Sequence, residues 1–202
     1  MLQKDSRMFD LKGRVILLAT GNIHKFDEAR RVLAESGISA GMLKVKKVEI
    51  QSDCLEEIAE CSVIDAFNRC RLPLIVEDAG LFVAALKGFP GPYAAYVYKT
   101  ISNPGILKLM EMVPNRKATF RSIIAYYDGR SDVICFEGEA LGRIANDEIW
   151  GNLKTGFGFD PIFQPVGSEK TFAEMTIEEK NYYSHRANAV RKFAEWFKSK
   201  RC

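Results

Sequence analysis

The sequence lacks the features that mark several common classes of protein. No apolar run approaches the roughly 20 residues that a membrane-spanning helix needs, and no secretory signal, internal repeat or low-complexity segment is present. The five cysteines are an odd number without a C-x-x-C pair, so we expect reduced thiols in a cytoplasmic protein. A zinc site from Cys54, Cys61 and Cys70 is disfavoured, because the close paired spacing of zinc ligands is missing.

Charge of either sign is also not in large excess. The 29 Lys and Arg stand against 26 Asp and Glu, which leaves a formal net charge of +3. This is too small to indicate a nucleic-acid polymer or a membrane surface as partner, but it allows a local anion site. Hydrophobic residues make up 47% of the 202 residues, as is ordinary for a soluble globular protein. We expect an irregular leader over residues 1–13 and one domain over residues 14–202, compact or split into two lobes that share a sheet.

The first half of the chain alternates between strand and helix patterns. Arg14–Thr20 is an apolar run of strand length, which predicts a strand buried on both faces. Asn22 is a favourable N-cap for a following helix that ends near Gly37. The next expected elements are a strand over Met42–Ile50, a helix over Leu55–Arg71 ended by Pro73, and a short strand over Leu74–Val76 that closes at Glu77 and Asp78.

The second half predicts a hairpin and further helices. The expected elements are an extended segment over Leu81–Leu86, a helix over Ile106–Met112, a hairpin of residues 118–127 and 132–141, a capping box from Thr176 to Glu179, and a helix after the N-cap Ser184. Crossover connections combined with a hairpin favour an α/β fold with a mixed sheet.

The turn Thr20-Gly-Asn-Ile-His-Lys25 joins the first strand to the first helix. Backbone N–H groups at a helix N-terminus favour an anion, and Gly21 lets a phosphate approach the backbone. Lys25 lies in the first helical turn, where its ammonium could reach the same anion. The alternative is an ordinary capped turn, and the spacing is not that of a P-loop.

Glu77 and Asp78 follow a short apolar strand, and Glu49 ends another. Adjacent carboxylates on a strand point to opposite faces, so one could bind a metal while the other orients water. Mg²⁺ takes carboxylate oxygens together with substrate phosphates, which fits these acids. The alternative is that they are solvent-facing acids at the mouth of a loop.

A third motif contains the residues Phe157, Gly158, Phe159 and Asp160, followed further on by Ser184-His-Arg186. The two rings could stack on a flat base that the glycines let approach, or they could belong to the core. As N-cap, Ser184 places His185 and Arg186 in the first helical turn, where their donors could face a 6-oxo group of a purine. A 6-amino group would leave these donors unpaired. The alternative for Arg186 is a surface ion pair with Glu178 or Glu179.

These motifs stand in the order found in one protein family. The chain resembles the inosine triphosphate pyrophosphatase family over about residues 14–198. The matching blocks are Thr20–Lys25, Glu49–Gln51, Glu77–Leu81 with Gly88–Tyr93, and Gly156–Phe163 through Arg186. The resemblance implies an elongated α/β mixed-sheet fold of two lobes with a central cleft, usually a homodimer. It also implies Mg²⁺-dependent hydrolysis of non-standard purine nucleoside triphosphates (ITP, dITP, XTP) to the monophosphate and pyrophosphate.

The resemblance further implies a role for each matching residue. Glu49 and Asp78 would bind the metal, and Asp78 would also accept the proton of the attacking water, with Glu77 as its catalytic neighbour. The implied substrate-binding residues are Thr20, Gly21, Asn22, Ile23, His24 and Lys25 for the triphosphate, Ala79 beside the acids, Phe157, Gly158, Phe159 and Asp160 around the base, and Lys180, His185 and Arg186.

The chain departs from the family pattern in two places. Ala79 stands where many members have Ser or Thr, so a hydroxyl contact is lost. Many members also carry a lysine on the helix after the Glu49 strand; here none lies between Lys47 and Lys87, and Arg69 or Arg71 could replace it.

Two other functions stay open, and so does the identity of the dimer surface. The nucleotide could carry another modified base, or the protein could be a sensor that binds without hydrolysis. The acids Glu49, Glu77 and Asp78 disfavour a sensor, because a binder of polyanions gains nothing from clustered negative charge unless a metal intervenes. Apolar residues around Pro90–Tyr98 could form the dimer interface or line the cleft.

Overall fold

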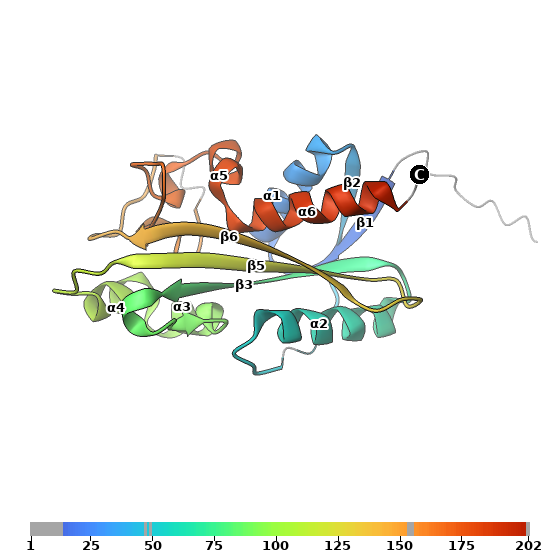
Figure 1. Ribbon diagram of the computed structural model, residues 1–202, viewed down its shortest axis with the longest axis horizontal. Coiled ribbons are helices and arrows are strands. Elements are labelled where there is room, and N and C mark those ends of the chain that lie inside the picture. Colours follow the sequence, from blue (N-terminus) through green and yellow to red (C-terminus); the bar gives the residue numbers. More distant parts are fainter. Residues whose placement is uncertain (1–13, 47, 49, 153–155, 201–202) are drawn as a thin grey trace, which may run out of the picture.

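A single mixed β-sheet forms the centre of the molecule (Figure 1). The computed structural model describes residues 14–46, 48, 50–152 and 156–200. The strands lie in the order β2-β1-β3-β5-β6-β7, with β4 against β3. Both neighbours of β1 are parallel to it, and the other pairs are antiparallel. The strands are β1 Arg14–Ala19, β2 Ile38–Leu43, β3 Leu74–Val83, β4 Pro90–Gly91, β5 Lys117–Tyr127, β6 Ile134–Ile144 and β7 Phe163–Pro165.

Helices cover both faces of the sheet. Figure 1 shows α1, α5 and α6 on one face and α2, α3 and α4 on the other. The helices are α1 Ile23–Glu35, α2 Leu55–Cys70, α3 Ala94–Thr100, α4 Ser102–Leu109, α5 Ile177–Tyr183 and α6 His185–Ser199, with short 3₁₀ turns η1 Ala84–Leu86, η2 Asp160–Ile162 and η3 Phe172–Glu174. Within the described ranges, none of these helices has the length and apolar character to cross a membrane.

The long strands β3, β5 and β6 run through two lobes that share the sheet. In the lobe with β1 and β2, one apolar cluster lies between the sheet and helices α1 and α6, and another lies between the sheet and α2. The second lobe has its own cluster, which includes Leu81, Phe163 and Phe172. This arrangement confirms the expected α/β mixed-sheet fold of two lobes.

Several predicted elements are confirmed together with the residues that end them. Helix α2 stops where Arg71 turns left-handed at a φ of 57°, two residues before Pro73. Helix α6 begins after Ser184, whose hydroxyl accepts the Ala187 N–H at 3.1 Å. The hairpin of β5 and β6 forms as expected. Strand β1 is buried on both faces only from Leu18 onward, because Val15 is 37% exposed.

The prediction that a strand closes at Glu77 and Asp78 is wrong. Strand β3 continues to Val83, because β5 pairs with it from Leu74 through Val83. The two acids therefore lie in the middle of a strand, and their side chains point to opposite faces of the sheet.

Three other boundaries differ from the expectation. The strand expected over residues 42–50 is instead β2, which ends at Leu43 because its partner β1 ends at Ala19 in register with it. Helix α4 begins and ends earlier than expected, since Pro104 is tolerated in its first turn. Helix α3 was not predicted, and it lies in the segment expected to form the dimer interface or to line the cleft.

Candidate functional site

A cavity of about 460 Å³ opens between the two lobes. Its walls come from the start of α1, from β3, α3 and β5, from the loop before η2, and from α6. The predicted site residues that line it are Asn22, His24, Lys25, Ala79, Gly158, Phe157, Phe159, Asp160, His185 and Arg186. Phe120 and Trp150 add aromatic walls that the sequence motifs did not indicate, and Tyr98 comes from the apolar segment Pro90–Tyr98 expected to line the cleft or to form the dimer interface.

The turn from β1 to α1 is held by its own side chains. Asn22 caps α1, and its Oδ1 accepts the N–H groups of His24 at 3.0 Å and Lys25 at 3.2 Å. The Thr20 hydroxyl accepts the Asn22 N–H at 3.1 Å. Gly21 and Ile23 are exposed at this turn. Two of the helix N-terminal amides expected to meet an anion are thus already bonded to Asn22, and the capped turn is confirmed.

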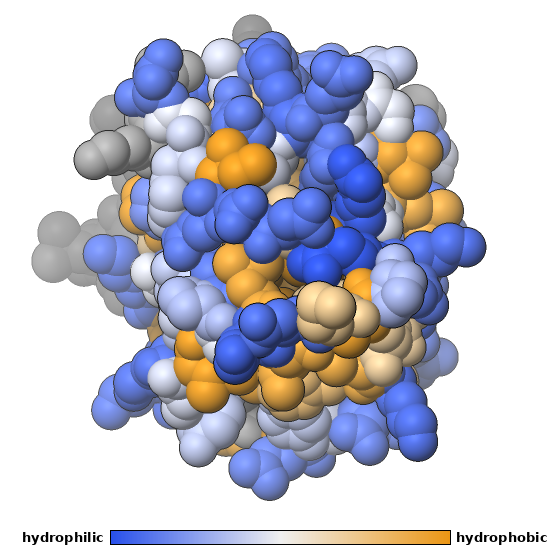
Figure 2. Space-filling view, turned by 90° about the vertical axis from the view of Figure 1, so that its left-hand side faces the viewer, coloured by the Kyte–Doolittle hydropathy of each residue, from blue (hydrophilic) through white to orange (hydrophobic). Residues whose placement is uncertain are grey.

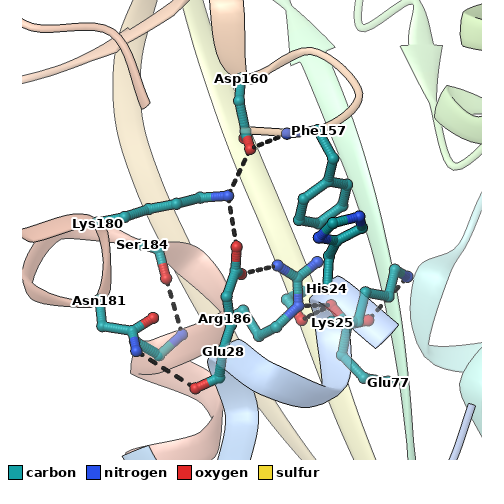
Figure 3. A network of polar contacts seen from close by, with 12 residues as sticks. His24, Lys25, Glu28, Glu77, Phe157, Asp160, Lys180, Asn181, Ser184 and Arg186 are labelled. Carbon is teal, nitrogen blue, oxygen red and sulfur yellow. Dashed lines mark hydrogen bonds and ion pairs between the residues drawn. The ribbon is translucent and has the colours of Figure 1, made fainter. Parts of the chain in front are cut away.

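Glu77 is the second member of a row of alternating charges that begins at the part-exposed Lys25 and is buried from Glu77 onward (Figure 3). One carboxylate oxygen accepts from the Ser122 hydroxyl at 2.7 Å and from Arg186 Nε at 3.0 Å. The other oxygen pairs with Lys25 Nζ at 2.8 Å. Burial raises the pKa of Glu77, but Arg186 and Lys25 together outweigh it and hold that pKa well below the ordinary value. Glu77 is therefore an ionised, fully engaged carboxylate.

The row continues through Glu28, a residue that the sequence motifs missed. Glu28 on α1 is 3% exposed and pairs with Lys180 at 2.6 Å and with Arg186. Lys180 also donates to Asp160 at 2.6 Å. We call the whole row the buried ion chain: Lys25, Glu77, Arg186, Glu28, Lys180 and Asp160. Three carboxylates alternate with three cations, so each buried charge has an opposite neighbour.

The two carboxylates that share Lys180 differ in acidity. Burial raises the pKa of Glu28, but Lys180 and Arg186 outweigh it and the pKa falls below the ordinary value. For Asp160, burial and the nearby Glu28 charge raise the pKa despite Lys180. Asp160 also accepts the Phe157 N–H at 2.8 Å, which connects the loop of residues 156–159 with the buried ion chain.

Arg186 and His185 both lie at the start of α6 and are buried, at 3% and 2% exposure. The alternative of a surface ion pair for Arg186 is wrong, because Glu178 pairs with Arg31 and Glu179 with Lys170. Two of the five guanidinium N–H groups of Arg186 bind Glu77 and Glu28, which leaves donors for the cavity that it lines.

His185 presents a neutral imidazole to the same cavity. Its ring stacks on Phe120 with centroids 4.6 Å apart and planes 9° apart. Burial, followed by the charge of Arg186, lowers the pKa of His185 well below the ordinary value. Its Nδ1 is buried and has no hydrogen-bond partner among the described residues. An unpaired buried polar atom costs about 1–3 kcal/mol.

Phe157 and Phe159, both in the loop of residues 156–159, make different contacts. Phe157 stacks directly on His24 with centroids 5.3 Å apart, and Lys180 Nζ lies 4.6 Å from the centre of the Phe157 ring. Phe159 is 3% exposed and packs edge-on against Tyr98 at 5.4 Å. Phe159 therefore belongs to the core of the second lobe while one side of it faces the cavity.

Of the two acids proposed as metal ligands, the structure describes Asp78. Strand alternation directs Asp78 to the face opposite Glu77 and Ala79, and Asp78 does not line the cavity. Its carboxylate has the oxygen donors that Mg²⁺ prefers. Glu49, the second proposed ligand, lies outside the described residues.

One group of side chains in the described part of the chain has metal-binding spacing: Glu56, Glu60 and Cys135. Burial, followed by the charges of Glu60 and Glu56, raises the pKa of Cys135 to about 12, so its thiol stays protonated at neutral pH. A protonated thiol is a poor ligand and Mg²⁺ prefers oxygen donors, so this group does not fit the implied ion.

Neither arginine considered as a substitute for the missing family lysine lines the cavity. Arg69 pairs with Asp65 at 3.0 Å, and Arg71 lies over the Phe67 ring at 5.9 Å. Among the described residues, the positive charges at this site are the three cations of the buried ion chain, Lys25, Lys180 and Arg186.

Fold and cavity together define an α/β protein with a ligand site between two lobes. The chain matches the Ham1 family over residues 16–196. It is 48% identical over 184 residues to a dITP/XTP pyrophosphatase of Methanopyrus kandleri, covering 91% of this chain and 96% of that protein. It is 50% identical over 183 residues to a dITP/XTP pyrophosphatase of Thermococcus kodakarensis, covering 91% and 97%.

Solved structures agree with these sequence matches. A HAM1 protein from Coxiella burnetii superposes with a TM-score of 0.79 at 26% identity, covering 92% of this chain and 99% of that one. A dITP/XTP pyrophosphatase from Mycobacterium abscessus superposes with a TM-score of 0.68 at 30% identity, covering 89% and 98%. The chain belongs to the Ham1 family, and the resemblance inferred from its motifs is confirmed.

Proposed function

We propose that this protein hydrolyses non-standard purine nucleoside triphosphates (ITP, dITP and XTP) to the monophosphate and pyrophosphate. The similar proteins from M. kandleri and T. kodakarensis carry the name dITP/XTP pyrophosphatase. The observation that carries the proposal is the pair at the start of α6, where the neutral imidazole of His185 and the guanidinium of Arg186 line one cavity.

This pair suits a purine with a 6-oxo group. The oxygen accepts from Arg186, while the imidazole of His185 can donate or accept according to its tautomer. The 6-amino group of adenine would bring a donor toward Arg186 and leave the guanidinium unpaired. A buried unpaired donor costs about 1–3 kcal/mol, which corresponds to about a 5- to 150-fold preference for the 6-oxo base.

Hydrolysis itself needs a water, a proton acceptor and neutralisation of the phosphate charge. Water attacks the α-phosphorus, and the bond from that phosphorus to the pyrophosphate oxygen breaks. Asp78 takes the proton of the water, an assignment that rests on the family resemblance and not on the lining of the cavity. Mg²⁺ supplies charge neutralisation when bound, with the carboxylates of Asp78 and Glu49 as ligands. Glu77 is less suited to orient water, because Lys25, Arg186 and Ser122 already engage both its oxygens.

The assembly and the compartment are part of the same proposal. A homodimer would cover apolar surface on α3 and beside it, where Tyr96 is 69% and Ile101 is 41% exposed. Figure 2 shows the end of the molecule that carries α3 and α4, with hydrophobic residues gathered near the middle and hydrophilic residues around them. Four unpaired cysteines among the described residues suit a reducing cytoplasm.

The test is an incubation with ITP and Mg²⁺ that measures pyrophosphate and IMP. Asp78→Asn should abolish both products while circular dichroism and thermal unfolding stay close to the wild type. Asp132→Asn, an exposed acid between β5 and β6, is the matched control and should keep full turnover. Near-normal turnover in Asp78→Asn contradicts the assignment of Asp78. Tight ITP binding by the wild type without products would instead identify a sensor.

A further inference from the structure

Trp150 is an exposed tryptophan on the wall of the cavity. Its side chain is 44% exposed and lines the same cavity as Phe157 and His185. It belongs to none of the three apolar clusters formed by the described residues. A large aromatic ring left in water costs free energy that core packing would recover, so its position needs another explanation.

The backbone on both sides of Trp150 is firmly attached to the second lobe. The Ile149 N–H donates to the Pro161 carbonyl at 2.9 Å, and the Ile149 carbonyl accepts from the Thr171 hydroxyl at 3.2 Å. The Gly151 N–H donates to the Ala173 carbonyl at 3.1 Å. A segment without regular secondary structure is thus held by three hydrogen bonds within three residues, which limits where the indole can point.

The indole is also fixed by its polar edge. Its Nε1 donates to Glu148 Oε1 at 3.0 Å, and the same oxygen accepts from Asn103 Nδ2 at 3.0 Å. Asn103 on α4 is 1% exposed, and its amide also donates to the Gly158 carbonyl at 3.3 Å. Asn103 and Glu148 therefore connect Trp150 with the loop that carries Phe157.

We propose that Trp150 is a stacking residue for the base of the bound nucleotide, held in place by Glu148 and Asn103. An indole face accepts any flat ring, and stacking of a base on one aromatic ring lowers the dissociation constant about 5- to 150-fold. Trp150 would set the affinity for the base, while His185 and Arg186 choose among bases. This inference rests on the proposed function, because it needs a nucleotide in the cavity.

The test uses IMP as the probe, since a monophosphate cannot be turned over. Trp150 and Trp196 are the two tryptophans of the chain. In a Trp196→Phe background, tryptophan fluorescence comes from Trp150 alone. Added IMP should quench this fluorescence until the signal saturates. The dissociation constant from this titration should equal the one measured by isothermal titration calorimetry. Trp150→Ala should raise that constant about 5- to 150-fold, while Trp150→Phe, which keeps a ring, should raise it less.

Turnover separates this role from a merely structural one. Trp150→Ala should raise KM for ITP and leave kcat within a few-fold, with thermal unfolding unchanged because the ring is outside the core. Tyr182→Ala, at 76% exposure and away from the cavity, is the matched control and should leave both parameters unchanged.

Two results would overturn the proposal and can be told apart. If the wild type binds IMP but Trp150→Ala binds it equally well, Trp150 does not stack on the base. A change of oligomeric state in that variant would then identify a contact between copies. If the wild type neither binds IMP nor hydrolyses ITP, the proposed function fails together with this inference.

Discussion

Replacing Glu28 with Gln removes the central negative charge of the buried ion chain while keeping the shape of the side chain. Glu28 is 3% exposed and contacts Lys180 at 2.6 Å as well as Arg186. Lys180 keeps Asp160 and Arg186 keeps Glu77, but one buried positive charge is left in excess, and breaking a buried ion pair costs about 3–5 kcal/mol. For a chain of this length each kcal/mol lowers the melting temperature by about 2–4 °C, so we expect a drop of about 6–20 °C.

The assay is urea unfolding followed by circular dichroism. Glu178→Gln is the matched control, because its 66% exposed carboxylate pairs with Arg31 at the surface and should contribute less than about 1 kcal/mol. A double-mutant cycle of Glu28→Gln with Lys180→Met should give an interaction free energy of about 0.5–3 kcal/mol. A loss below about 0.5 kcal/mol in Glu28→Gln, no larger than in the control, would refute the view that the buried ion chain stabilises the fold.

The same substitution should change how stability depends on pH. Glu28 and Glu77 have lowered pKa values in the folded state. The stability they contribute is fully present above their ordinary pKa and is lost as pH falls through the folded values. Asp160, with a raised pKa, contributes in the opposite direction, so its stabilisation is lost as pH rises. Below about pH 5 the free energy of unfolding should therefore fall less steeply in Glu28→Gln than in the wild type.

Two further predictions concern α6 and the base pocket. Arg186→Lys keeps a charge near Glu77 but loses the planar guanidinium, so the ratio of kcat/KM for ITP to that for ATP should fall about 10-fold or more; an unchanged ratio would contradict the role given to Arg186. Gly138→Ala would place a Cβ 2.2 Å from the His185 carbonyl oxygen and 2.3 Å from the Ala189 nitrogen. Thermal scans should show a strongly destabilised protein, and a melting temperature equal to the wild type would contradict the close packing of β6 on α6.

Local signals predicted the parts of the fold that depend on neighbouring residues. The apolar run before Gly21, the cap Asn22 and the cap Ser184 each act within a few positions, and the elements they indicate are present. The course of β3 through Glu77 and Asp78 could not be inferred in this way. Its partner β5 lies more than 40 residues further along the chain and supplies the ladder that carries the strand past both acids.

The same distinction applies to the site. His185 and Arg186 stand in a recognisable motif, but Glu28 resembles any charged residue of an exposed helix face. Its partners Lys180 and Arg186 follow 152 and 158 positions later, so the pairing is visible only in the folded chain. One signal was present: Glu28 shares a helix face with the apolar residues Ala29 and Val32, where a lone charge is expensive without a partner.

Steady-state hydrolysis of ITP and ATP by the wild-type protein with Mg²⁺, followed through pyrophosphate and both monophosphates, tests the central claim most directly. A pocket that pairs Arg186 and His185 with a 6-oxo group predicts IMP and pyrophosphate as products, with kcat/KM for ITP about 5- to 150-fold above that for ATP. Equal rates for the two nucleotides, or release of inorganic phosphate in place of pyrophosphate, would contradict it.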